Sequence, residues 1–216
     1  MHRRHVCLYL LGFALLALSG KIAFAAPSAA LQELLRQIFV DQTFEEQHSP
    51  QFEWFDDGAA YTALEKSKDV PDAQDIVRYT TASGKREVLI SAQSLIPTGQ
   101  EKPLGIEGYQ FSKDKQRLLI FTNTKPVWRQ QTRGDYWLLD LNAKTLERLG
   151  GEGEPSSMQF AKFSPGGNAV AFVRSNNLFV QDLADRRVRP LTRDGSHTII
   201  NGTSDWVYEE ELELRD

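Results

Sequence analysis

The sequence has 216 residues, of which 41% are hydrophobic and 25% are charged, an ordinary composition for a soluble globular protein. Its 29 acidic and 25 basic residues give a formal net charge of −4, which argues against a polyanionic partner such as a nucleic acid. This length allows one large domain or two small ones.

The first 25 residues have the pattern of a secretory signal peptide. Arg3 and Arg4 form a positive region, residues 6–18 form an apolar core, and residues 23–25 (Ala-Phe-Ala) offer a cleavage site. An uncleaved N-terminal anchor is the alternative, although this apolar run is short for a membrane span. Cleavage after residue 25 would remove the only cysteine, Cys7. We therefore expect an exported protein, periplasmic or extracellular, without disulfides.

Residues 29–39 are predicted to form a short amphipathic helix. Leu31, Leu34, Leu35 and Ile38 follow the i, i+3, i+4, i+7 spacing of a single helix face, and Ser28 can cap the N-terminus. We expect residues 26–50 to be a helix and lead-in, and residues 51–216 to be a separate β domain.

From Phe52 onward, short predicted strands recur in three similar sets. Each set begins with a Phe before a turn, at Phe55, Phe111 and Phe163, which are 56 and 52 residues apart. The strands after these turns are predicted at 59–64, 75–79 and 86–90, at 118–121, 135–141 and 146–149, and at 169–173, 177–183 and 188–191. A four-stranded unit repeated about every 50 residues predicts β-propeller blades.

The predicted fold class is all-β: a partial β-propeller of about three four-stranded blades and the start of a fourth, preceded by the signal peptide and one short helix. A β-sandwich with hairpins that look alike by chance is the alternative. Propellers commonly have four to eight blades, and three blades alone would leave an exposed strand edge. The sequence is therefore expected to be the front portion of a longer protein.

The second blade has extra residues between its second and third strands. They fall in 123–134, NTKPVWRQQTRG, and include Trp128, Arg129 and Arg133. A lengthened connection here is expected to project from one rim of the propeller, where binding residues gather on rigid scaffolds. A solvated hairpin tip without a role is the alternative.

The sequence has no recognisable catalytic motif. It contains no G-x-S-x-G elbow, no P-loop and no G-x-G-x-x-G. Beyond the signal peptide, His48 and His197 are isolated and lack the spacing of metal ligands. We therefore predict no catalytic residue, no cofactor and no metal in this chain.

The segment DWVYEEEL, residues 205–212, places two aromatics before three consecutive glutamates. Like charges repel, so the arrangement becomes favourable when a cation lies between them. On a helical turn two of Glu209, Glu210 and Glu211 can surround one ammonium, whereas on a strand neighbours face opposite ways. Trp206 and Tyr208 are expected to hold the turn against the propeller. A solvated acidic tail is the alternative.

Residues 201–212, NGTSDWVYEEEL, resemble the signature of the dipeptidyl peptidase IV group in the prolyl oligopeptidase superfamily of serine peptidases. Residues 127–141, VWRQQTRGDYWLLDL, resemble the W-R segment of that family, and residues 161–180 are similar to its third-blade strands. The resemblance covers residues 28–216. It implies an eight-bladed propeller followed by a C-terminal α/β-hydrolase domain, which this sequence lacks, so the chain alone is expected to be inactive.

The resemblance also implies roles for individual residues. By position in the motif, Glu210 and Glu211 would bind the free α-ammonium of a peptide substrate, and Arg129 would bind the carbonyl of the second residue from the cleaved bond. Asp205, Trp206 and Tyr208 would be supporting residues. The family often has His after the arginine, whereas Gln130 stands here, which puts the detailed geometry of this loop in question.

The implied function is substrate binding in a secreted serine exopeptidase that releases N-terminal dipeptides, typically X-Pro or X-Ala. Its partner would be a peptide with a free N-terminus, and the family is often dimeric. No membrane contact is expected after signal cleavage. The alternatives are a non-catalytic exported propeller that binds protein partners and a relative with another peptidase specificity.

Overall fold

The computed structural model describes residues 27–44 and 52–214. The predicted signal peptide and His48 lie outside the described residues. The chain divides into two compact units, residues 1–49 and residues 50–216.

The described part of the first unit contains the predicted helix, α1 (Ala29–Phe39). Ser28 caps it, because the Ser28 Oγ accepts a hydrogen bond of 3.2 Å from the Leu31 N–H. None of its residues is buried, so its apolar face has no covering within the described unit. Among the residues described, no helix is long and apolar enough to cross a membrane.

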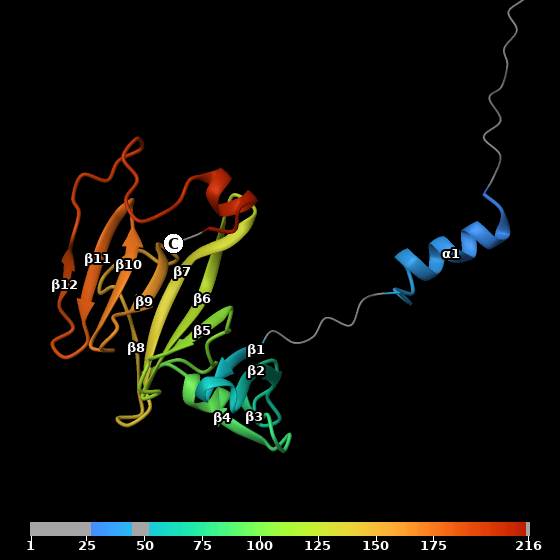
Figure 1. Cartoon of the computed structure of the whole chain (residues 1–216), viewed down its shortest axis with the longest axis horizontal. Coiled ribbons are helices and arrows are strands. Elements are labelled where there is room, and N and C mark those ends of the chain that lie inside the picture. The colour runs from blue at the N-terminus through green and yellow to red at the C-terminus, as the bar shows by residue number, and fades with distance from the viewer. Residues whose placement is uncertain (1–26, 45–51, 215–216) are drawn as a thin grey trace, which may run out of the picture. The chain divides into compact units, whose positions relative to one another are not determined.

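The second unit consists of three successive sets of four antiparallel strands, as predicted (Figure 1). The first set is β1 (Phe52–Phe55), β2 (Ala60–Lys66), β3 (Gln74–Thr80) and β4 (Arg86–Ile90). The second is β5 (Gly108–Phe111), β6 (Arg117–Val127), β7 (Gln130–Asp140) and β8 (Thr145–Arg148). The third is β9 (Met158–Phe163), β10 (Ala169–Arg174), β11 (Asn177–Asp182) and β12 (Val188–Pro190). The short helical turns are η1 (Asp56–Gly58), η2 (Ala92–Leu95) and η3 (Val207–Glu211).

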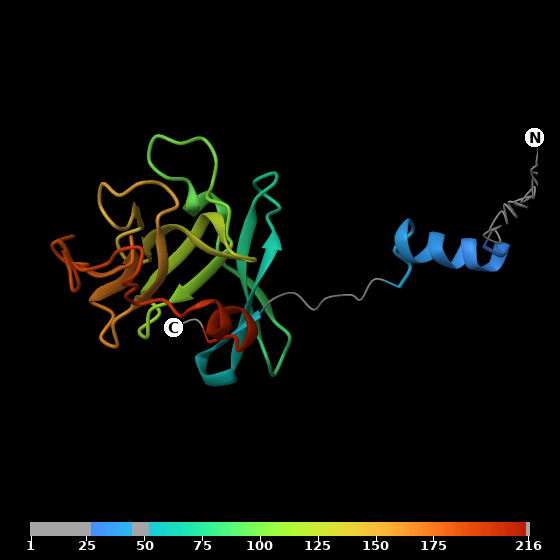
Figure 2. The same ribbon diagram turned by 90° about the horizontal axis from the view of Figure 1, so that it is seen from above.

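The second set of strands packs against both of the others, because it lies between them (Figures 1 and 2). Side chains alternate along a strand, so Leu118 and Ile120 of β6 pack with Ile76 of the first set. Between them, Leu119 points the other way and packs with Phe172 of the third set. This alternation explains why β6 is apolar at successive positions although it is a strand.

The segment 123–134 differs from expectation, because it continues two strands instead of forming a loop. β6 and β7 stay paired to Val127↔Gln130, and a two-residue turn joins them. Because the two strands stay paired, their backbone N–H and C=O groups hydrogen-bond to each other, whereas those of a loop would bond to water. The lengthened β7 also pairs with β9, at Arg133↔Gln159 and Gly134↔Met158, so the second and third sets share one sheet.

Candidate functional site

The acidic segment forms a π-helical turn, η3 (Val207–Glu211). The Leu212 N–H donates to the Val207 carbonyl over 3.2 Å, five residues back. The Asp205 carboxylate accepts a hydrogen bond of 3.1 Å from the Tyr208 N–H, which satisfies one of the donors left open at a helix start. The three glutamates were expected to lie on a helical turn, and the structure agrees.

The turn gives the three consecutive glutamates different environments. Glu209 is fully buried, the side chain of Glu210 is 3% exposed and that of Glu211 is 52% exposed. Successive side chains point in different directions around a helical turn, so neighbours in sequence reach the interior, the boundary and the surface. This arrangement is unlike a solvated acidic tail, in which all three would be exposed.

The tip of the β6–β7 hairpin lies at this turn (Figure 1). Its first turn residue, Trp128, has a φ of 53°, a left-handed conformation that costs a non-glycine residue about 1–2 kcal/mol. The next residue, Arg129, donates its backbone N–H to Glu210 Oε1 over 3.1 Å. The strained turn is therefore held by a contact with the glutamate turn, far away in sequence.

The side chain of Arg129 joins the two glutamates that the resemblance singled out. Its Nε lies 2.9 Å from Glu210 Oε2, and its Nη2 lies 3.0 Å from Glu211 Oε1. The guanidinium carbon is 5.6 Å from the centre of the Trp206 ring, within the range of a cation–π contact. The structure thus brings Arg129, Glu210, Glu211 and Trp206 together in one cluster.

The supporting residues contribute in different ways. Asp205 caps the turn through its carboxylate, and Trp206 faces Arg129. Tyr208 is half exposed, and its backbone takes part in the turn: its N–H donates to Asp205 and its carbonyl accepts from the Leu214 N–H. The expectation that both aromatics brace the turn stays a prediction.

A cavity of about 530 Å³ adjoins the cluster. It lies between the hairpin, β9 and the segment that leads into η3, and its walls include Trp128, Arg133, Gln159, Trp206 and Glu209. Sequence reasoning found no role for Glu209. The only signal was its place as the first of three glutamates, and that does not show which of the three points inward.

The base of the hairpin is held by Asp135 of β7. Its carboxylate accepts hydrogen bonds from Asn123 Nδ2 at 2.7 Å, from Arg148 Nη2 at 2.8 Å and from the Ser156 N–H at 2.9 Å. Burial alone would raise the pKa of Asp135, but these bonds outweigh it and hold the pKa below its usual value. The hairpin that carries Arg129 is therefore fixed at its base as well as its tip.

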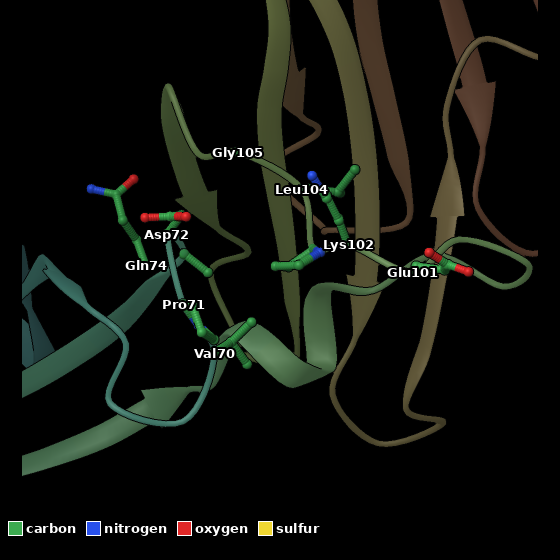
Figure 3. A pocket seen from close by; sticks show the side chains of 10 residues that line it. Val70, Pro71, Asp72, Gln74, Glu101, Lys102, Leu104 and Gly105 are labelled. Atoms are coloured by element: carbon green, nitrogen blue, oxygen red, sulfur yellow. The ribbon is translucent and has the colours of Figure 1, made fainter.

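A second cavity, of about 350 Å³, shares no lining residue with the cluster. Figure 3 shows Val70, Pro71 and Asp72 on the β2–β3 connection and Lys102 and Leu104 on the segment that precedes β5. Neither segment carries a residue singled out in the sequence.

Residues 112–216 match the family described as "Dipeptidyl peptidase IV (DPP IV) N-terminal region". A probable dipeptidyl-aminopeptidase B of Emericella nidulans is 36% identical over 120 residues, which are 52% of this chain and 13% of that protein. The dipeptidyl aminopeptidase B of Saccharomyces cerevisiae is 34% identical over 138 residues, 63% of this chain and 16% of that protein. The chain thus spans a small part of the length of these relatives.

Among solved structures, Porphyromonas gingivalis dipeptidyl peptidase 4 matches with a TM-score of 0.70 and 27% sequence identity. The match covers 84% of this chain and 25% of that one. It confirms the predicted partial β-propeller, in which the three sets of strands are successive blades. The chain belongs to the dipeptidyl peptidase IV family and carries its N-terminal region.

Proposed function

We propose that Glu210 and Glu211 bind the protonated N-terminal amine of a peptide, and that Arg129 binds the carbonyl beside it. The observation that carries this proposal is the Arg129 cluster, in which one guanidinium faces two carboxylates. The cluster keeps an excess negative charge, and an ammonium supplies the charge and the donors that match it.

The chemistry of a peptide terminus suits this cluster. A free α-amino group has a pKa of about 7.7–8.0, so it is mostly protonated at neutral pH. Two carboxylates favour that charged form further. An internal peptide bond carries no such charge, so the cluster would distinguish the end of a peptide from its middle.

We further propose that the complete protein is a serine exopeptidase that releases N-terminal dipeptides, exported through the signal peptide predicted at residues 1–25. A fixed amine sets the distance to the cleaved bond, so a nucleophile beyond the propeller reaches the bond after the second residue. The names of the relatives, dipeptidyl aminopeptidase and dipeptidyl peptidase, support this reading. The nucleophile and its base would come from a hydrolase domain of the complete protein.

The test is dipeptide release by the full-length protein with Glu210→Gln and Glu211→Gln, using an Ala-Pro chromogenic substrate. Truncating one partner of a buried, hydrogen-bonded charge pair costs about 2–5 kcal/mol, so kcat/KM should fall by about 30-fold or more in Glu210→Gln, whose side chain is 3% exposed, and by less in Glu211→Gln. Glu211→Gln should leave stability unchanged because Glu211 is half exposed. Glu210→Gln should also lower the melting temperature, since Glu210 is buried and holds the hairpin tip.

The matched control is Glu213→Gln, which removes an exposed carboxylate two residues beyond the turn and should keep full kcat/KM. Full turnover by both Glu210→Gln and Glu211→Gln would refute the ammonium site. Complete absence of peptide hydrolysis by the wild-type protein would favour the non-catalytic exported propeller instead.

A further inference from the structure

We propose that Arg129 is an internal competitor for Glu211, which the ligand's ammonium must displace, while the pair between Arg129 and Glu210 stays in place. This inference rests on the proposed function, because it concerns the same cluster. It makes Arg129 a specificity-determining residue that rejects amines without an adjacent acceptor.

The two ion pairs of Arg129 differ in how firmly they are held. Glu210 binds Arg129 twice, through Oε1 to the backbone N–H and through Oε2 to Nε, and its side chain is 3% exposed. Separating this pair would leave a buried carboxylate without its partner, which is costly. The Glu210 contact therefore persists when a ligand binds.

The Glu211 contact is easier to exchange. It is a single bond from Nη2, and the side chains of Glu211 and Arg129 are 52% and 65% exposed. Ion pairs exposed to this degree contribute little to stability. A ligand ammonium that reaches Glu211 therefore has only a weak internal contact to replace.

The freed Nη2 determines which ligands gain from this exchange. The backbone N–H and Nε of Arg129 stay on Glu210, and the guanidinium stays near Trp206, so Nη2 remains beside Glu211. There it can donate to an acceptor next to the bound ammonium. An α-amino amide carries such a carbonyl, whereas a simple amine displaces Nη2 and leaves it without a protein acceptor.

Three small probes of related structure separate these contributions. Alaninamide has both the ammonium and the carbonyl, isopropylamine replaces the carboxamide by a methyl, and isobutyramide replaces the amine by a methyl. Their dissociation constants for the full-length protein would be measured by ligand-observed NMR at pH 7 and constant ionic strength. With wild-type protein we expect isopropylamine to bind at least tenfold more weakly than alaninamide, and isobutyramide to show no binding.

The decisive measurement uses Arg129→Ala, with Arg129→Gln as a second variant that keeps side-chain volume. Removing the Arg129 side chain should tighten isopropylamine binding by only about two- to fivefold, because the exposed ion pair that competes for Glu211 is weak. It should weaken alaninamide binding at least tenfold, because the donor to the ligand carbonyl is lost. A purely structural role of Arg129 would weaken both probes together. The control is Lys125→Ala, which removes an exposed cation from the same hairpin and should leave both constants unchanged.

Unchanged isopropylamine binding in both Arg129 variants, with weaker alaninamide binding, would overturn the competition and leave the proposed function standing. In that case Arg129 would act on the carbonyl alone. If alaninamide does not bind the wild-type protein, or binds Glu211→Gln equally well, the proposed function itself fails and the competition fails with it.

Discussion

Glu209, Glu210 and Glu211 are chemically identical, yet each one has its own surroundings. Glu209 lies in the interior against the cavity, Glu210 is held by two groups of Arg129, and Glu211 has a single exposed contact with it. The differences come from the helical turn and from what it packs against. The turn therefore decides which carboxylate can meet a ligand.

Asp205 should matter to the site through this turn. Its carboxylate accepts from the Tyr208 N–H, and losing such a cap costs about 1 kcal/mol. We predict that Asp205→Ala loosens the turn and weakens alaninamide binding several-fold, whereas Asp205→Asn keeps an acceptor and loses less. Amide hydrogen exchange at residues 207–212 measures the turn directly. Equal protection in Asp205→Ala and wild type would contradict this role.

At the scale of elements, the β6–β7 hairpin is the part that carries Arg129 to the glutamates. Its close fit is visible at Gly134, where an added Cβ would lie 2.6 Å from a Phe121 ring carbon and from the Thr122 carbonyl oxygen. The backbone of β7 therefore approaches β6 more closely than a larger residue allows. Asp135 follows directly and fixes the same strand to Asn123, Arg148 and Ser156.

The pKa of Asp135 leads to a prediction about acid stability. Because the folded state holds this pKa below its unfolded value, the carboxylate contributes stability above the unfolded pKa of about 3.9 and loses it as pH falls through the folded pKa. Asp135→Asn should unfold more easily at pH 7, by about 3 kcal/mol. Urea denaturation should also show a shallower loss of stability for Asp135→Asn than for wild type below about pH 4. Parallel acid profiles of the two proteins would contradict this assignment.

At the scale of the whole second unit, two apolar clusters join three blades. The cluster between the second and third blades includes Leu119, Tyr136, Met158 and Phe172, and the cluster between the first and second includes Ile76, Ile90, Leu118 and Ile120. The second blade belongs to both, so it joins the packing of the described strands into one unit. The hairpin with Arg129 extends from this central blade.

Phe172 is 1% exposed at the centre of the cluster between the second and third blades. We predict that Phe172→Ala lowers the free energy of unfolding by about 3–5 kcal/mol without changing ligand affinity in the fraction that stays folded. Leu191→Ala, at a half-exposed position, is the control and should change stability little. Urea unfolding and a probe titration below the transition measure the two effects. A loss of affinity without a loss of stability would show that Phe172 acts on the site instead.

Much of the fold could be predicted because its signals are local. The helix at 29–39 was predicted from apolar spacing and the Ser28 cap, and both are confirmed. The strands were predicted from alternation and turn residues at the repeated Phe positions, and they are confirmed with small shifts at their ends. The elongated strands at 123–134 were missed, because polar residues such as Asn123 and Lys125 read as a loop until a partner strand is present.

By itself the sequence determined the all-β class, the period of the blades, the amphipathic helix and the residues with the chemistry to bind an ammonium. These properties depend on side-chain type and short spacing, which are local. Only the tertiary structure decided that Arg129 meets Glu210 and Glu211, that Glu209 is buried, and that β7 pairs with β9. Those contacts join segments far apart in the chain, so they form only once the packed blades bring the hairpin tip and the glutamate turn to one place.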